Sequence, residues 1–154
     1  MSKITLSKAL SLKKRLVGDI ERLAKIIISN NSWRVDNEPE YDVNETYDKY
    51  VQAKKKLVDL KTAISAANAP IQGKIFQLAE LKDQINTVRK IEAKKGKRLE
   101  TVGRYGSESA EFEFTCAMGR KTLDEMTTIL QDGIDELQAD LDAFNANTQI
   151  EFEI

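Results

Sequence analysis

Apolar residues recur at intervals of three and four over four long stretches of the chain, the spacing that places them on one face of an α-helix. The stretches cover about residues 6–29, 44–67, 74–93 and 119–144. Between the second and the third, Pro70 restricts the residue before it and Gly73 permits a turn, so we expect a break there. The pattern therefore predicts four long amphipathic helices.

Polar residues stand where these helices should begin. Thr5 or Ser7 can cap the first helix, and Asn44, closely followed by Glu45, can cap the second. The last helix has the most regular apolar seam, with spacings typical of a coiled coil. Its members are Leu123, Met126, Leu130, Ile134, Leu137, Leu141 and Phe144.

Two short segments alternate with a period of two, which is typical of a β-strand with one apolar face. They are residues 111–116 and 149–154, and they flank the last helix, so they could form one small sheet. Residues 94–110 are rich in lysine, arginine and glycine, and we expect them to form a basic loop.

Together these elements predict an all-α dominated fold with a minor β hairpin. We expect one helical domain over residues 1–154, built as an antiparallel bundle or helical hairpin. Apolar stripes this long on so few helices bury more area than one chain can cover. We therefore expect a homo-oligomer, with strand edges paired within or between subunits.

The composition argues against an enzyme. The chain has no histidine, which removes the usual general base and the usual metal ligand. Cys116 is the only cysteine and has no histidine partner, so we interpret it as a small strand residue. Four acidic residues of the last helix are spaced for adjacent faces, but a solvated acidic face is the simpler interpretation. They are Asp132, Asp135, Glu136 and Asp140. We expect no metal and no cofactor.

No apolar run approaches the roughly 20 residues of a membrane span. The first residues lack the features of a signal peptide, and a single cysteine suits a reducing compartment. We therefore expect a cytoplasmic protein that does not enter a membrane.

The net charge of −1 is the sum of two parts of the chain that carry opposite charge. Residues 1–104 carry 22 lysines and arginines against 13 acids, whereas residues 105–154 carry 2 against 12. Such parts are suited to pair with each other, within or between subunits. A general binder of duplex nucleic acid would be more basic overall, so we do not expect that partner.

The basic segment is the first candidate site. Arg98, Arg104, Tyr105 and Ser107 could bind a phosphate and stack on a base, with glycines that let backbone N–H groups approach the anion. Arg120 and Lys121, at the start of the last helix, would add charge and free N–H groups. The alternative is a solvated loop whose cations meet the acidic helix of a neighbour. No phosphate-binding GxxxxGK[ST] motif occurs, so the sequence does not indicate nucleotide hydrolysis.

Two further residues are candidates for ligand contact. Trp33, in the polar segment 30–43, either covers the end of the helical core or stacks on a ligand. Asn68, at the predicted break, either caps or turns the backbone or faces a pocket between subunits.

Several segments resemble a family of small helical proteins of bacteria and their phages, some of which are called septicolysin. The matching segments are LKTAISAANAPIQGKIFQLAELKDQI, RYGSE, EFEFTCAMGRKTLDEM, and LDAFNANTQ followed by IEFEI. They lie in roughly the last two-thirds of the chain, and the 30–43 loop and the lysines at 94–98 lie outside the match. The resemblance implies long helical hairpins that assemble into a symmetric ring such as a hexamer. In size and style the chain is also similar to phage sponge proteins, which sequester nucleotide signals of bacterial immunity.

The sequence thus favours a non-enzymatic, homo-oligomeric protein that sequesters a small anionic ligand, with a cyclic or other nucleotide immune signal as the leading class, in pockets between subunits. It would act in the evasion of anti-phage defence. The alternative is a structural protein that docks a protein partner through coiled-coil surfaces.

Overall fold

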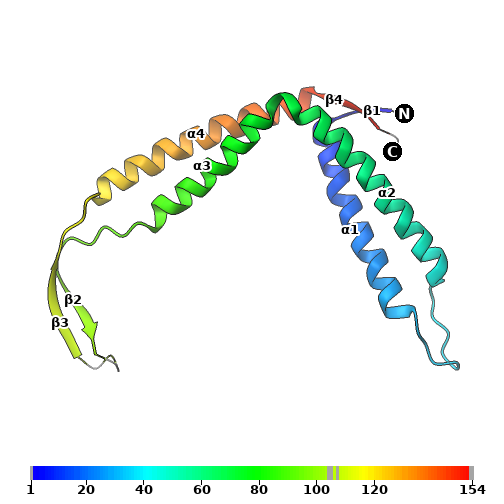
Figure 1. The fold of residues 1–154 in the computed structure, drawn as a ribbon, viewed down its shortest axis with the longest axis horizontal. Coiled ribbons are helices and arrows are strands. Elements are labelled where there is room, and N and C mark those ends of the chain that lie inside the picture. Colours follow the sequence, from blue (N-terminus) through cyan, green and yellow to red (C-terminus); the bar gives the residue numbers. More distant parts are fainter. Residues whose placement is uncertain (1, 104–105, 107, 153–154) are drawn as a thin grey trace. The chain divides into compact units, whose positions relative to one another are not determined.

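The structure, a computed structural model, describes residues 2–103, 106 and 108–152 (Figure 1). Its helices are α1 (Leu6–Asn30), α2 (Val43–Asn68), α3 (Gln72–Lys90) and α4 (Arg120–Asn147), with a short 3-10 helix, η1 (Ala69–Ile71), after α2. Its strands are β1 (Ser2–Thr5), β2 (Gly96–Val102), β3 (Glu108–Phe114) and β4 (Gln149–Phe152). Helices dominate and strands are a minor part, as the sequence predicted.

The chain divides into two compact units. We call Met1–Gly73 together with Asp140–Ile154 the terminal unit, and Lys74–Ala139 the central unit. Each unit is described by itself. None of the helices in the described residues combines the length and the apolarity needed to cross a lipid bilayer.

The predicted break between the second and third helices is not a loop. α2, η1 and α3 follow one another without a non-helical residue from Val43 to Lys90. Pro70 is accommodated because it lies in the first turn of η1. The N–H groups of a first turn donate no hydrogen bond within their helix, so the missing N–H of proline costs little there. The described residues therefore form three continuous helical segments, and the prediction of four separate helices is wrong.

One of the two predicted N-caps is correct. Thr5 caps α1, because its side-chain oxygen accepts a hydrogen bond from the backbone N–H of Lys8 at 3.3 Å. α2 is capped by Asp42 and not by Asn44, with Asp42 Oδ1 3.0 Å from the backbone N of Glu45. A carboxylate at this position also interacts favourably with the positive end of the helix dipole.

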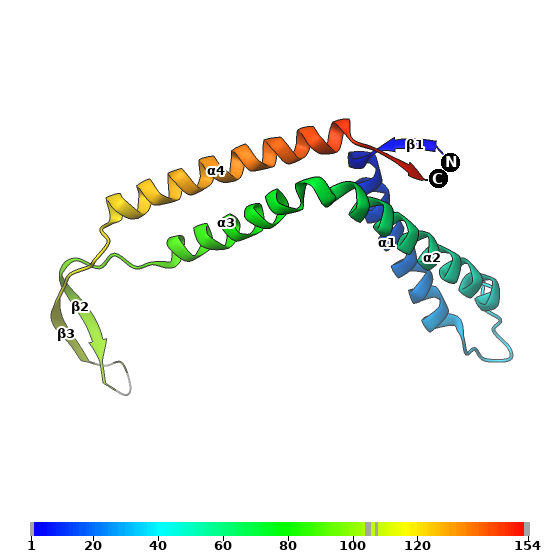
Figure 2. The same ribbon diagram turned by 45° about the horizontal axis from the view of Figure 1, so that its top comes forward.

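The terminal unit packs α1 antiparallel to α2 and places the β1–β4 sheet where α1 begins (Figures 1 and 2). The two strands are antiparallel, with Ile4 opposite Ile150. Their apolar side chains join the first turns of α1 and the last turns of α2 in one buried cluster. The cluster comprises Ile4, Leu6, Ala9, Leu60, Ile64, Ile150 and Phe152.

The central unit pairs α3 with the first part of α4. Lys82 Nζ lies 3.4 Å from Gln138 Oε1, and an Arg89 nitrogen lies 3.3 Å from Gln131 Oε1. Arg89 lies seven residues after Lys82 on α3, whereas its partner Gln131 lies seven residues before Gln138 on α4. The two helices are therefore antiparallel. Their buried residues are Leu78, Ile85 and Val88 on α3, and Leu123 and Ile134 on α4.

The predicted strands exist, but they do not pair with each other. β3 pairs with β2 to form an antiparallel hairpin in the central unit, and β4 pairs with β1 in the terminal unit. Residues 96–102, expected to be loop, form β2. Gly96 begins this strand at a φ of 83°, a conformation that favours glycine over other residues.

Candidate functional site

The predicted anion site falls partly within the described residues. Arg98 lies on β2 with an exposed side chain, whereas Arg104, Tyr105 and Ser107 lie outside the described residues. Arg120 and Lys121 are the first two residues of α4, and both are exposed.

The β2–β3 register gives Arg98 a partner that the sequence did not suggest. Arg98 lies directly opposite Phe112, so both side chains project from the same face of the hairpin. Opposed residues of an antiparallel pair have Cβ atoms about 4.5–5.5 Å apart. Phe112 is 44% exposed, which leaves part of its ring open to solvent on the face of the hairpin that Arg98 shares. A cation and an aromatic face together suit a ligand with an anionic group and a planar ring.

Lys94, which precedes β2, makes two ion pairs at the base of the hairpin. Lys94 Nζ lies 2.9 Å from Glu100 Oε1 and 3.3 Å from Glu92 Oε2, and it stands over the Phe114 ring at 5.5 Å. The hydrogen bond that Lys94 donates to Glu100, with a second that it donates to Glu92, raises the pKa of Lys94 above its ordinary value.

Three further cations lie near the base of the hairpin and on β2. Lys95, Lys97 and Arg98 make no ion pair with any residue that the structure describes. Glu92 and Glu100 are the only acids of the segment from Arg89 to Val102, and both are held by Lys94. On β3, Glu113 lies directly opposite Lys97 and Glu111 lies opposite Leu99, so the hairpin as a whole is not positively charged. Arg98 is the cation of β2 that has no acid directly opposite it among the described residues.

The second predicted cluster is more nearly neutral. Arg120 lies 3.8 Å from Asp124, and Lys121 lies 4.0 Å from Glu125, each one turn further along α4. These four side chains, with Thr128 and Ile129, line an open depression on α4 to which β2 contributes nothing. The structure thus does not bring Arg98 into one pocket with Arg120 and Lys121.

Trp33 and Asn68 lie far apart. Trp33 is 53% exposed and lines a polar pocket of the segment before α2, with Pro39, Tyr41 and Asp42 among its neighbours. Asn68 ends α2, 26 residues or about 39 Å of helix away. Its side chain makes no capping hydrogen bond, and its buried Oδ1 has no hydrogen-bond partner among the described atoms. Only neighbouring chains could bring these two residues into one site.

No metal site emerges from the described residues. They contain no group of three or more His, Cys, Asp or Glu side chains placed to hold an ion. Cys116 is half-buried beside Glu92, Lys94 and Met118 at the base of the hairpin.

Comparisons with known proteins support the fold alone. No protein-family model and no curated protein sequence matches this chain. Among solved structures, a functionally unknown conserved protein from Corynebacterium diphtheriae is similar, with a TM-score of 0.66 and 13% sequence identity. The match covers 97% of this chain and 100% of that one. The same arrangement of elements is thus found in a second, distantly similar sequence.

Proposed function

We propose that this protein is a non-enzymatic binding protein that acts as a homo-oligomer, such as a hexamer, and captures a small anionic ligand of the nucleotide class. The observation that supports it is the Arg98–Phe112 pair: a guanidinium that makes no ion pair with any described residue and a partly exposed ring, directly opposite each other on one face of the β2–β3 hairpin. In this mechanism Arg98 binds the phosphate through its planar fork of donors, and Phe112 stacks on the base.

The hairpin also supports the oligomeric part of the proposal. A two-stranded ribbon is only marginally stable in water when nothing packs on it. In this hairpin Leu99 is 71% exposed, and no described residue of either strand is fully buried. A neighbouring subunit that covers the ribbon would stabilise it and enclose the ligand. Capture of a nucleotide immune signal in this way would be stoichiometric, as in a sponge protein.

A thermal-shift screen tests the proposal. The purified protein is heated with mono-, di- and cyclic nucleotides and with ADP-ribose derivatives. A ligand that binds only the folded state raises the melting temperature in proportion to the logarithm of its concentration. We expect at least one member of the panel to do so and to be recovered unmodified after heat release. A flat response to the whole panel would contradict the proposal.

A matched pair of variants tests the site. Arg98→Gln and Lys97→Gln each remove one exposed cation from adjacent residues of β2, but their side chains project from opposite faces. We expect R98Q to lower ligand affinity at least about tenfold, because a hydrogen bond to a charged group contributes roughly 1.5–3 kcal/mol. K97Q should change it less than about threefold, since an exposed charge contributes little. Equal effects of the two would reduce the site to general electrostatic attraction.

Arg104 and Arg120 remain predicted ligand contacts. Arg104→Ala and Arg120→Ala should each abolish binding and leave the oligomer intact in size-exclusion chromatography with light scattering. Unchanged binding in both variants would restrict the site to the Arg98–Phe112 face.

A second candidate function, docking of a protein partner, is favoured by α2. Tyr47, Val51 and Val58 lie on one face of this helix and are 53%, 47% and 62% exposed. They stand about 120° around the helix from the buried residues Leu57, Leu60 and Ile64, given 100° per residue. If Val51→Asp with Val58→Asp leaves ligand binding unchanged but removes a partner from a pull-down, this second function is the better description.

A further inference from the structure

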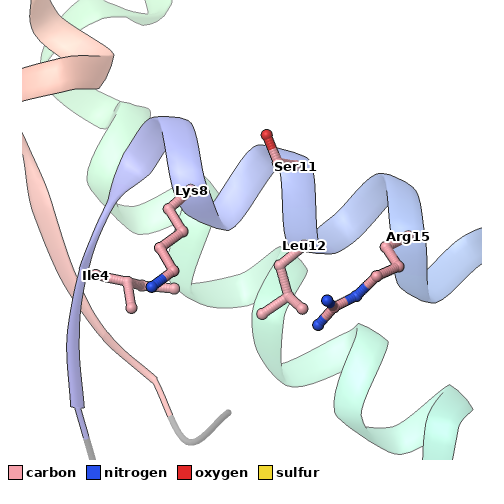
Figure 3. A pocket seen from close by; sticks show the side chains of 5 residues that line it. All are labelled: Ile4, Lys8, Ser11, Leu12 and Arg15. Atoms are coloured by element: carbon pink, nitrogen blue, oxygen red, sulfur yellow. The ribbon is translucent and has the colours of Figure 1, made fainter.

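A small pocket opens between β1 and the first three turns of α1, and none of the candidate ligand-binding residues considered above lines it (Figure 3). It is lined by Ile4, Lys8, Ser11, Leu12 and Arg15 and has a volume of about 220 Å³. Figure 3 shows the Lys8, Leu12 and Arg15 side chains on the same side of α1, while the Ser11 hydroxyl points away from them. The helical spacing explains the row, since Leu12 is four residues after Lys8 and three before Arg15.

The segment that lines this pocket carries charge of one sign, although Lys3 on β1 lies opposite Glu151 of β4. Residues 1–18 contain Lys3, Lys8, Lys13, Lys14 and Arg15 and no acid at all. Lys8 and Arg15 make no ion pair with any residue that the structure describes. Asp19, the first acid along the chain, lies 3.5 Å from Arg22.

The position of Lys8 adds to the imbalance. It lies in the first turn of α1, which contains no acidic residue. The N-terminal end of a helix carries partial positive charge, so a cation there is unfavourable and an anion is favourable. An anion beside Lys8 would interact favourably with the ammonium and with the helix end, and the long Arg15 side chain can reach toward it from two turns further along α1.

The remaining walls of the pocket are aliphatic. Ile4 is 4% exposed and belongs to the buried cluster, and Leu12 is half-buried against it. None of the described residues that line the pocket is aromatic, so none offers a ring on which a base could stack, and the pocket is smaller than the roughly 300–1,000 Å³ of pockets for drug-sized ligands. These features fit an aliphatic group of a few carbons and do not fit a whole nucleotide.

We propose that this pocket binds a small anion that carries an aliphatic group, such as a short-chain carboxylate, with Lys8 and Arg15 on the anionic group and Ile4 and Leu12 against the aliphatic chain. This site is in the terminal unit and does not depend on the hairpin site of the central unit.

Titration of the full-length protein with hexanoate, followed by amide chemical shifts, tests the proposal. We expect saturable shifts for residues 4–15 at millimolar concentrations, an affinity of about −4 kcal/mol. Hexanol has the aliphatic chain without the anionic group, and inorganic phosphate has the anionic group without the chain. Each should therefore bind at least about tenfold more weakly than hexanoate. Absence of saturable shifts with hexanoate, or equal binding of inorganic phosphate, would overturn the assignment.

Three variants that each remove one exposed cation of α1 complete the test. Lys8→Gln and Arg15→Gln should each weaken hexanoate binding about tenfold. The control is Lys14→Gln, whose residue is equally exposed but does not line the pocket, and it should change binding less than about twofold. Because all three side chains are exposed, the variants should keep the wild-type far-UV spectrum. An equal loss in K14Q would show a diffuse basic surface and reject the pocket.

Discussion

The two antiparallel sheets of this chain are built from similar strands and placed in opposite environments. In the β1–β4 sheet Ile4, Ile150 and Phe152 are at most 7% exposed. Ser2 Oγ donates to the Phe152 carbonyl at 3.2 Å, and the Leu6 N–H donates to the Thr148 carbonyl at 2.8 Å. In the longer β2–β3 hairpin no described residue reaches that burial.

The difference indicates which sheet serves stability and which is displayed. Burial of large apolar side chains is the main favourable contribution to folding, so the β1–β4 sheet holds the two ends of the terminal unit together. The hairpin makes little use of that contribution in a single chain, and it carries Arg98, which has no acid directly opposite it. Stability and ligand capture should therefore respond separately to substitutions in the two sheets.

Two phenylalanines give the largest expected contrast. Phe152→Ala removes a ring that is 7% exposed, and we expect it to lower the free energy of unfolding by about 3–5 kcal/mol. Phe112→Ala truncates a ring that is 44% exposed and should lower it by less than about 1 kcal/mol, while it weakens nucleotide binding. Urea unfolding followed by circular dichroism measures both. A similar loss of stability in the two variants would remove the distinction between the sheets.

Amide hydrogen exchange sharpens the same comparison without a mutation. Backbone N–H groups of the hairpin ladder should exchange at least about tenfold faster than those of Ile4 and Ile150, because a partly exposed ribbon opens locally. Ligand or self-association should then slow exchange in the hairpin and leave the β1–β4 sheet unchanged. Slow exchange in the unliganded hairpin at low protein concentration would mean that the ribbon is stable by itself.

Substitution of glycine by alanine should change the stability of the protein in opposite directions at two positions. Gly96 has a φ of 83°, so Gly96→Ala should destabilise the start of β2 by about 1 kcal/mol. Gly18 is in the middle of α1 with no atom within 4 Å of an added Cβ, so Gly18→Ala should stabilise the protein by about 0.5–1 kcal/mol. Thermal unfolding of both variants gives the two signs. Stabilisation by G96A would show that this turn does not need the left-handed conformation.

The sequence was most informative where structure is local. Apolar periodicity placed the last helix at about 119–144, and it spans Arg120–Asn147. The break that we expected from Pro70 and Gly73 is not a loop, because a proline in the first turn of η1 is compatible with a helix. The helix-dominated fold with a minor β part was thus predicted correctly.

Strand pairing could not be read in the same way. β1 has only four residues, and in β2 charged and apolar residues do not alternate cleanly, so neither showed a strand period. Which strand pairs with which depends on contacts distant in sequence, up to 150 residues apart for Ser2 and Phe152. For the same reason chemistry alone made Arg98 a candidate for ligand contact, whereas the position of Phe112 opposite it became visible only in the register.

The smallest effect concerns Lys94, at the base of the hairpin. Its hydrogen bond to Glu100, followed by that to Glu92, raises the pKa of Lys94 above its ordinary value of 10.5. A group with a raised folded-state pKa contributes stability that is fully present below the unfolded-state pKa. That contribution is lost as the pH rises through the folded-state pKa, so it should be constant at neutral pH and decline only in strongly alkaline solution. Because the ammonium is open to solvent, the decline should be small.

Glu100→Gln isolates this contribution, since it removes the charge of the partner that raises the pKa most and keeps the side-chain length. We expect the pKa of Lys94, followed by the shift of its ε-protons in an alkaline titration, to fall toward the ordinary value in the variant. Glu92→Gln should lower it less, because its Nζ–Oε2 distance of 3.3 Å is longer than the 2.9 Å to Glu100. The freed Lys94 would then add one more cation beside Lys95 and Arg98, so E100Q should bind anionic ligand slightly better if hairpin charge governs capture. Unchanged or weaker binding would place the recognition in the Arg98–Phe112 geometry and not in the charge of the hairpin.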